Sequence, residues 1–303
     1  MSAVGRFLDS DFVWSFSRTP VAVVSAVVVL VVVIGAVFAG ALAPHNPFDL
    51  ASLDLMNGLK PPVWAADGDA SFVLGTDDQG RDVLSGIMYG TRISLIVAVL
   101  AIGFSLVVGI SMGLVAGYAG GAVDSLLMRV VDVQLTFPSI LIALLVDGVV
   151  RAALPRDMQA NLELYVIVFA IGISRWPQFA RTVRGSTMVE RQRDYVMAAK
   201  VIGLSSVRIM LTHILPNVLG PVLVIATLNL GLAILDEATL SFLGVGLPPT
   251  EPSLGTLIRI GNNFLFSGEW WITIFPGVTL AAMVLSINLL GDWLRDALNP
   301  RLR

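Results

Sequence analysis

Residues 20–43 read PVAVVSAVVVLVVVIGAVFAGALA, a run of 24 residues without a charged side chain. A helix needs about 20 mostly apolar residues to cross the hydrocarbon core of a bilayer, because it rises about 1.5 Å per residue. This run therefore predicts a membrane-spanning helix. It is longer than the apolar part of a secretory signal peptide, although Ala41-Leu42-Ala43 resembles a cleavage site. We expect a retained anchor, with a cleaved signal peptide as the alternative.

The composition of the whole chain extends this interpretation. Only 14% of the 303 residues are charged and 56% are hydrophobic, whereas soluble domains carry about 25% charged residues. The chain contains no cysteine, which excludes disulfide bonds, thiolate nucleophiles and cysteine-ligated metals. An integral membrane protein is expected.

Five further apolar runs predict an all-α, polytopic membrane protein with six transmembrane helices. They comprise two clear runs, 93–123 and 270–291, and three weaker ones, 133–146, 164–174 and 217–243. The helix in 93–123 is expected to end near Gly117. The helix in 164–174 is long enough only if Arg175 snorkels at its end.

The basic residues predict the orientation of these spans. Cytoplasmic loops of membrane proteins are enriched in Lys and Arg, and an arrangement with both termini inside places 13 of the 19 basic residues there. The N-terminal segment is expected to be an amphipathic surface helix, or alternatively disordered. The predicted organisation is a cytoplasmic segment 1–19, a first helix 20–43, an extracytoplasmic segment 44–92, a core 93–291 with five helices and a cytoplasmic loop 175–216, and a cytoplasmic tail 292–303.

Several kinds of chemistry have no support in the sequence. Neither lysine, Lys60 or Lys200, stands in the glycine-rich context of a phosphate-binding loop. His45 and His213 are predicted on opposite sides of the membrane, and no acidic loop has metal-ligand spacing. We therefore expect no catalytic residue, no metal site and no cofactor bound by this chain. A membrane-bound hydrolase is therefore disfavoured. We expect this chain to contact membrane lipid and not nucleic acid.

Three glycines recur every four residues in the run 93–123, at Gly109, Gly113 and Gly117. Small residues at this spacing let helices approach closely in lipid. They predict tight helix packing, within the chain or with a partner, and a substrate site is the alternative.

The predicted cytoplasmic loop carries a motif. Residues 193–217 read RDYVMAAKVIGLSSVRIMLTHILPN, and they resemble the Glu-Ala-Ala loop of bacterial ABC-type importer permeases. The matching positions are Ala198, Ala199, Gly203, Leu215 and Pro216. Met197 stands where the family has Glu, and His213 where it has Ile. An ordinary amphipathic helix is the alternative interpretation.

A second resemblance covers most of the chain. The segments 74–86 (LGTDDQGRDVLSG), 89–95 (YGTRISL), 241–249 (SFLGVGLPP) and 291–303 (GDWLRDALNPRLR) are similar to the C-type subunit of the peptide/nickel branch of these permeases. Leu254-Gly255 departs from the Trp-Gly of many members, and Asp292-Trp293 from the common Asp-Gly.

The resemblance implies the ABC importer type I permease fold in a bacterial cytoplasmic (inner) membrane. It implies a permease subunit that imports dipeptides or oligopeptides by alternating access. The implied partners are a second homologous permease, two cytoplasmic ATPases that bind ATP and Mg, and an extracytoplasmic solute-binding protein. Nickel chelates, glutathione or other small solutes are alternative substrates, and an ion-coupled secondary transporter is the alternative mechanism.

The resemblance also suggests which residues face the ATPase. The coupling helix would dock through Arg193, Asp194, Ala198, Ala199, Gly203, Leu215 and Pro216. Gly203 permits a sharp turn and Pro216 opens the following span. Asp194 is expected either to cap its helix, where a carboxylate complements the dipole, or to contact the ATPase.

Two acidic groups have alternative interpretations. Asp236 and Glu237 would line the translocation path, or would pair locally near the outer interface, for instance with Arg259. Asp77, Asp78, Arg81 and Asp82 would face the binding protein. Alternatively, Asp77 or Asp78 would cap a helix that starts near Gln79, with Arg81 paired to a neighbouring carboxylate.

Overall fold

The computed structural model describes residues 15–47, 49, 53–153, 155–247 and 252–297, with only the backbone described for 156–161. Within these ranges the chain is mostly helical, and its extended pairing is confined to an isolated bridge between Thr76 and Asp82. The prediction of an all-α fold is therefore confirmed. Most of the N-terminal segment 1–19 and the end of the tail 292–303 lie outside the described residues.

The first apolar run forms two helices, α3 (Pro20–Val37) and the short α4 (Ala39–Leu42). Pro20 lies in the first turn of α3, where a missing backbone N–H costs nothing because that position has no helical acceptor. The helix is interrupted at Phe38, whose backbone leaves the helical conformation.

The longest helices, α5 (Val83–Ala119) and α8 (Arg156–Glu190), pack against each other in parallel. Contacts of α5 residues 109, 113 and 117 fall successively further along α8, near residues 179, 183 and 187. Both helices are longer than the sequence predicts. α5 begins well before the expected start at residue 93, and α8 continues past Arg175 and through Pro177.

The weak run 133–146 is not one straight span. α6 (Gly121–Thr136) and α7 (Ser139–Ala153) meet there with a bend of 95°. The break lies at Phe137, whose backbone is extended (φ −91°, ψ 137°). Phe137 precedes Pro138, and a residue before proline is disfavoured in the helical region. Because α5 and α8 run parallel, this bent pair carries the chain back between them.

The second half of the chain begins with α9 (Asp194–Val201) and α10 (Ser206–Ile209). The π-helical turn η2 (Met210–Ile214) then leads directly into α11 (Leu215–Phe242). The remaining helices are α12 (Leu254–Asn262), α13 (Trp271–Ala297) and the short 3-10 turns η1 (Leu55–Asn57) and η3 (Leu265–Ser267).

In the described part of the chain, four helical segments are long and apolar enough to cross a membrane. They are Pro20–Val37, Val83–Ala119, Ser206–Phe242 and Trp271–Ala297. The bent pair α6 and α7 gives a fifth if it counts as one span. A multi-pass membrane protein is thus confirmed, while the count of six helices stays a prediction that depends on α8.

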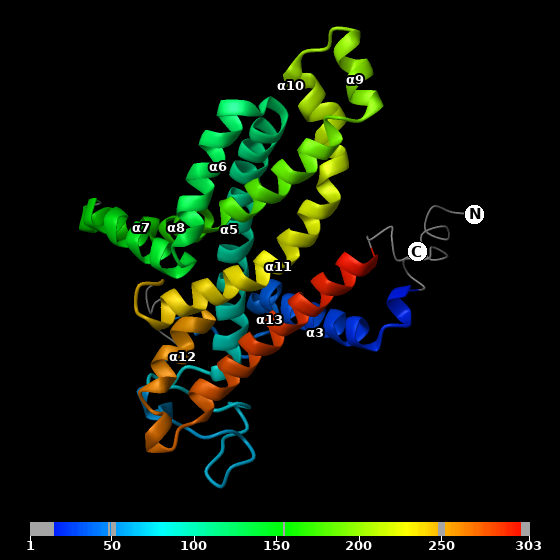
Figure 1. Cartoon of the computed structure of the whole chain (residues 1–303). Coiled ribbons are helices and arrows are strands. Elements are labelled where there is room, and N and C mark those ends of the chain that lie inside the picture. Colours follow the sequence, from blue (N-terminus) through cyan, green and yellow to red (C-terminus); the bar gives the residue numbers. More distant parts are fainter. Residues whose placement is uncertain (1–14, 48, 50–52, 154, 248–251, 298–303) are drawn as a thin grey trace.

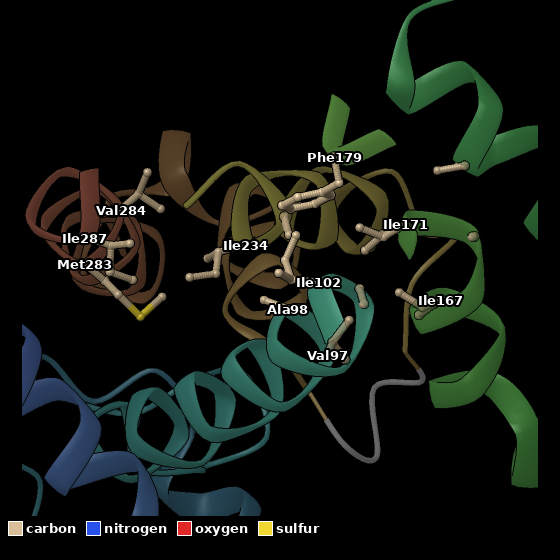
Figure 2. Packing of buried hydrophobic residues seen from close by; sticks show 14 of the residues in the cluster. Val97, Ala98, Ile102, Ile167, Ile171, Phe179, Ile234, Met283, Val284 and Ile287 are labelled. Atoms are coloured by element: carbon tan, nitrogen blue, oxygen red, sulfur yellow. The ribbon is translucent and has the colours of Figure 1, made fainter. Parts of the chain in front are cut away.

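The core lies where α5, α8, α11 and α13 meet (Figure 2). Its labelled members are Val97, Ala98, Ile102, Ile167, Ile171, Phe179, Ile234, Met283, Val284 and Ile287. In lipid, this packing contributes mainly through close van der Waals contact, because lipid tails are as apolar as the side chains themselves.

The two hydrophilic segments lie at opposite ends of the molecule. Figure 1 shows α9 and α10 projecting beyond the ends of α5 and α6, while the segment before α5 lies at the far end beside α12. This arrangement is what the predicted orientation requires of a cytoplasmic loop and an extracytoplasmic segment.

Candidate coupling interface and buried charged residues

The predicted coupling helix is α9, and Gly203 ends it. The Gly203 N–H donates to the carbonyl of Lys200, and the Leu204 N–H reaches back to Ala199. This pair of hydrogen bonds is a Schellman motif, which needs a left-handed residue after the helix. Gly203 has φ +81° and supplies it. The sharp turn that the sequence predicts at Gly203 is therefore present.

The two alanines of the motif face different ways. Ala198 is exposed, but only 3% of Ala199 is accessible. Neighbouring residues of a helix point about 100° apart, so both cannot face the same groove. The outward face of α9 and its turn instead presents Met197, Val201 and Ile202, all exposed. The prediction that Ala199 contacts a partner is wrong for this conformation, because Ala199 packs inside the chain.

Asp194 is the first residue of α9, in the turn where a carboxylate complements the helix dipole. Arg193 occupies the N-cap position, and no side chain of the described residues caps this end through a hydrogen bond. Asp194 is therefore placed to complement the dipole, as expected, although it is not itself the N-cap residue. Arg193 instead lies beside Glu190, with its Nε 3.8 Å from Oε1.

Tyr195 ties α9 to its neighbours. Its hydroxyl donates to Glu190 Oε2 on α8 at 2.5 Å and accepts from Asn217 Nδ2 on α11 at 3.1 Å. Partial burial and the bond to the Glu190 carboxylate raise the pKa of Tyr195 to about 12, because both disfavour the phenolate. Leu215 and Pro216 begin α11 beside this contact, Leu215 half-buried and Pro216 exposed.

Asp236 forms a buried ion pair that the sequence did not predict. Its Oδ2 accepts hydrogen bonds from Arg175 Nε at 2.8 Å and from Nη2 at 2.5 Å. Arg175 lies on α8 and Asp236 on α11, and both are buried. The predicted pairing with Arg259 is therefore wrong, and so is the snorkelling of Arg175. An acidic partner on a neighbouring helix lets the guanidinium stay inside the fold.

Glu237 is enclosed completely, with an accessible fraction of 0%. Its two carboxylate oxygens accept from different helices: Oε2 from Ser94 on α5 at 2.6 Å, and Oε1 from Ser241 on α11 at 2.7 Å. Ser94 Oγ also accepts from the backbone N–H of Leu254 at the start of α12. Glu237 therefore joins three helices, and its predicted pairing with Arg259 is wrong as well.

In the outer segment, Asp77 holds a tight turn. Its Oδ1 accepts from the backbone N–H groups of Gln79 and Arg81, and its Oδ2 accepts from Arg81 Nε at 2.8 Å. Arg81 is thus paired to a neighbouring carboxylate. Burial and the nearby Asp77 carboxylate raise the pKa of Asp78 above its usual range.

Asp82, rather than Asp77 or Asp78, caps the following helix. Its Oδ2 accepts from the backbone N–H of Ser85 at 2.9 Å, and α5 therefore begins at Val83 and not near Gln79. The turn is fastened to α13 as well, because Trp271 Nε1 donates to the carbonyl of Thr76 at 3.0 Å. This part of the outer segment is packed against the spans.

The three glycines of α5 lie against α8. A Cβ on Gly109 would come within 2.5 Å of Phe179 Cβ, and one on Gly113 within 2.6 Å of the Ala180 carbonyl oxygen. A Cβ on Gly117 would approach Thr187 Cβ to 2.7 Å. The close approach is therefore within the chain.

Among the described residues, no three His, Asp or Glu side chains are grouped closely enough to hold a metal ion. The expectation that this chain binds no metal or cofactor stays a prediction.

Two arginines were not predicted from the sequence: Arg175 as a partner of Asp236, and Arg191, which contacts the end of α5. An arginine at the end of an apolar run was the only available signal for Arg175.

Known proteins resemble the chain over nearly its whole length. Residues 109–303 match the family of binding-protein-dependent transport system inner membrane components, and residues 9–62 match the N-terminal transmembrane domain of oligopeptide transport permease C. The dipeptide transport system permease protein DppC of Haemophilus influenzae is 38% identical over 97% of this chain and 95% of its own. Its counterpart in Escherichia coli K12 is 42% identical, with 97% and 93% covered.

A solved structure shares the fold. A chain from the inward-facing MetNI methionine ABC transporter superposes with a TM-score of 0.55, covering 69% of this chain and 94% of that one at 18% identity. Together with the helices and the α9 turn described above, these matches show that the chain belongs to the family of binding-protein-dependent transport system inner membrane components.

Proposed function

We propose that this chain is a transmembrane permease subunit of an ATP-driven ABC importer for dipeptides or oligopeptides. Relatives of nearly equal length are dipeptide and di/tripeptide permeases. The observation that carries the proposal is the exposed α9, which ends in the Gly203 turn and projects at the opposite end from the outer segment (Figure 1). A helix of this kind can dock on a partner outside the membrane.

The mechanism is alternating access. Two cytoplasmic ATPases close on ATP and Mg, and α9 transmits their movement to the membrane-spanning helices. A second, homologous permease completes the translocation path, and an extracytoplasmic binding protein delivers the peptide. This chain performs no bond chemistry and binds no cofactor, since hydrolysis belongs to the ATPases.

Both termini lie in the cytoplasm in this proposal, with α9 on the same side. α8 then provides the sixth pass, because it runs parallel to α5 and returns the chain to the cytoplasmic end. Its apolar part is short, but Arg175 is neutralised by Asp236 rather than exposed to lipid. The docking face consists of Arg193, Asp194, Ala198, Gly203 and the exposed apolar residues of the turn.

Asp236 and Glu237 hold helices together in this proposal rather than contact the peptide. Both carboxylates are engaged within the chain, by Arg175 and by two serine hydroxyls. At the outer face, Asp78 has more freedom than Asp77 or Asp82 to meet the binding protein, because the latter two hold the turn and the cap of α5.

The test is uptake by proteoliposomes that contain the complete complex. We expect labelled dipeptide to accumulate when ATP is supplied on the ATPase side, and accumulation to persist after ionophores collapse the ion gradients. Uptake that needs an ion gradient but no ATP would overturn the proposal in favour of a secondary transporter. Mass spectrometry of the ligand retained by the native binding protein would separate peptides from nickel chelates, glutathione or other solutes.

A further inference from the structure

Arg191 lies at the junction between α8 and the coupling helix α9. It is the C-cap residue of α8, three positions before α9 begins. Its Nη1 donates to the carbonyl of Gly117 at 3.0 Å and to that of Tyr118 at 3.1 Å. These carbonyls belong to the last turn of α5, where the helix itself supplies no N–H partner. A positive charge there also complements the helix dipole.

The chain is shaped to leave room for this guanidinium. α5 is followed by its C-cap residue Gly120 and by Gly121, the first residue of α6, and both have a positive φ, +68° and +56°. A Cβ on Gly120 would come within 3.0 Å of Arg191 Nη1. The glycine turn thus directs the chain into α6 without covering the carbonyls that Arg191 uses.

A second contact joins α9 to the same point. Lys200, in the last turn of α9, places its Nζ 5.2 Å from the centre of the Tyr118 ring. This is within the range in which an aromatic face attracts a cation. Tyr118 is therefore held by residues on both sides of the start of α9: Arg191, three residues before α9, contacts its carbonyl, and Lys200, in the last turn of α9, contacts its ring.

In its N-terminal half, α5 contacts α11, α12 and the outer segment. Ser94 donates to Glu237 of α11 and accepts from Leu254 of α12, and Asp82 links the first turn to the outer segment. α5 runs for 37 residues between these points and contains no proline. An uninterrupted helix of this length spans about 55 Å, long enough to connect the two faces of a membrane.

We infer that Arg191 is a positioning residue, through which movement of α9 displaces α5 and so reaches the outer end of the molecule. The inference rests on the proposed function, because it presupposes that an ATPase moves α9. Arg191 differs from the docking residues in that its contacts lie within this chain. Its role is to make α5 follow α9, and not to hold the ATPase.

The experiment uses the complete complex in proteoliposomes and measures the ATP hydrolysed per peptide imported. Arg191→Met removes both hydrogen bonds but keeps a long side chain, whereas Arg129→Met removes an exposed arginine on α6 as a control. We expect Arg191→Met to assemble and hydrolyse ATP while the ratio rises about fivefold or more, a coupling change of the usual size for linked sites. Arg129→Met should keep the wild-type ratio.

A residue that only stabilised the end of α5 would lower the melting temperature without changing the ratio. An assembled Arg191→Met complex with a wild-type ratio would therefore overturn the inference. If Arg191→Met does not assemble, the comparison between Gly120→Ala and Gly121→Ala decides, because both strain a backbone with positive φ but only Gly120→Ala places a Cβ 3.0 Å from Arg191 Nη1. Equal ratios in those two variants would overturn it. A wild-type complex that imports nothing on ATP would instead refute the proposed function.

Discussion

Arg175 on α8 donates two hydrogen bonds to one carboxylate oxygen of Asp236 on α11, from Nε at 2.8 Å and from Nη2 at 2.5 Å. The two residues are 61 positions apart in the chain, and their side chains are 6% and 12% accessible. Two charges are therefore kept inside the fold only because they face each other. Losing either one leaves the other buried and uncompensated.

The variant Asp236→Leu should destabilise the protein by about 3–5 kcal/mol, because Arg175 would stay buried without its partner. The double variant Arg175→Met, Asp236→Leu should recover most of that loss, since no charge remains. Thermal unfolding of the solubilised complex measures both. A double variant as unstable as the single one would show that the ion pair is not the cause.

The double variant Asp236→Asn, Glu237→Gln tests whether these acids contact the peptide. We expect import at the wild-type rate in complexes that remain assembled, because the carboxylates are engaged by Arg175, Ser94 and Ser241. A rise in KM for dipeptide, with unchanged ATP hydrolysis in the absence of substrate, would instead place them on the translocation path.

Gly203 offers a matched pair of substitutions. Asn and Asp are nearly equal in size and both tolerate a left-handed backbone better than other residues, so the φ of +81° strains them alike. Gly203→Asp should abolish ATP-driven peptide import because it adds a charge to the docking face, whereas Gly203→Asn should retain most of that import. Both should insert in the membrane equally, as judged by blotting. Wild-type import by Gly203→Asp would contradict the assignment of α9 as the coupling helix.

Gly113 and Gly103 give a control within one helix. A Cβ on Gly113 would lie 2.6 Å from the Ala180 carbonyl oxygen, whereas one on Gly103 would meet no atom of the described residues within 4 Å. Gly113→Ala should therefore cost about 1–3 kcal/mol by overpacking, and Gly103→Ala should be neutral or stabilising. Thermal unfolding in detergent compares them, and equal melting temperatures would refute the close approach of α5 to α8.

The features that the sequence predicted depend on neighbouring residues in the chain. The first span follows from an uncharged run, and the turn after α9 follows from a glycine at the end of a helix. The bend at Pro138 was not predicted, although the proline before α7 gives it a local cause, because its size depends on how α6 and α7 pack against α8.

The features that the sequence did not predict depend on distant partners. Arg175 seemed to end a span because it follows an apolar run, and its partner Asp236 lies on another helix, 61 positions away. Ala199 seemed equivalent to Ala198 because spacing alone does not say which side of α9 packs inward. The cap of α5 was assigned too early because Asp77 and Asp82 are both suitable capping residues, and only the fold shows that Asp77 holds the preceding turn.

The hydrogen bond from Trp271 to Thr76 has a consequence for biosynthesis. Its two residues are separated by 195 positions, so the outer segment emerges from the membrane long before its fastening partner has been made. In the proposed orientation, the turn around Thr76 lacks this contact until α13 is inserted, and it is open to extracytoplasmic proteases during that interval. We therefore expect resistance of that turn to proteolysis to report that the last helix has been inserted, and nascent chains stalled before Trp271 to be cleaved there.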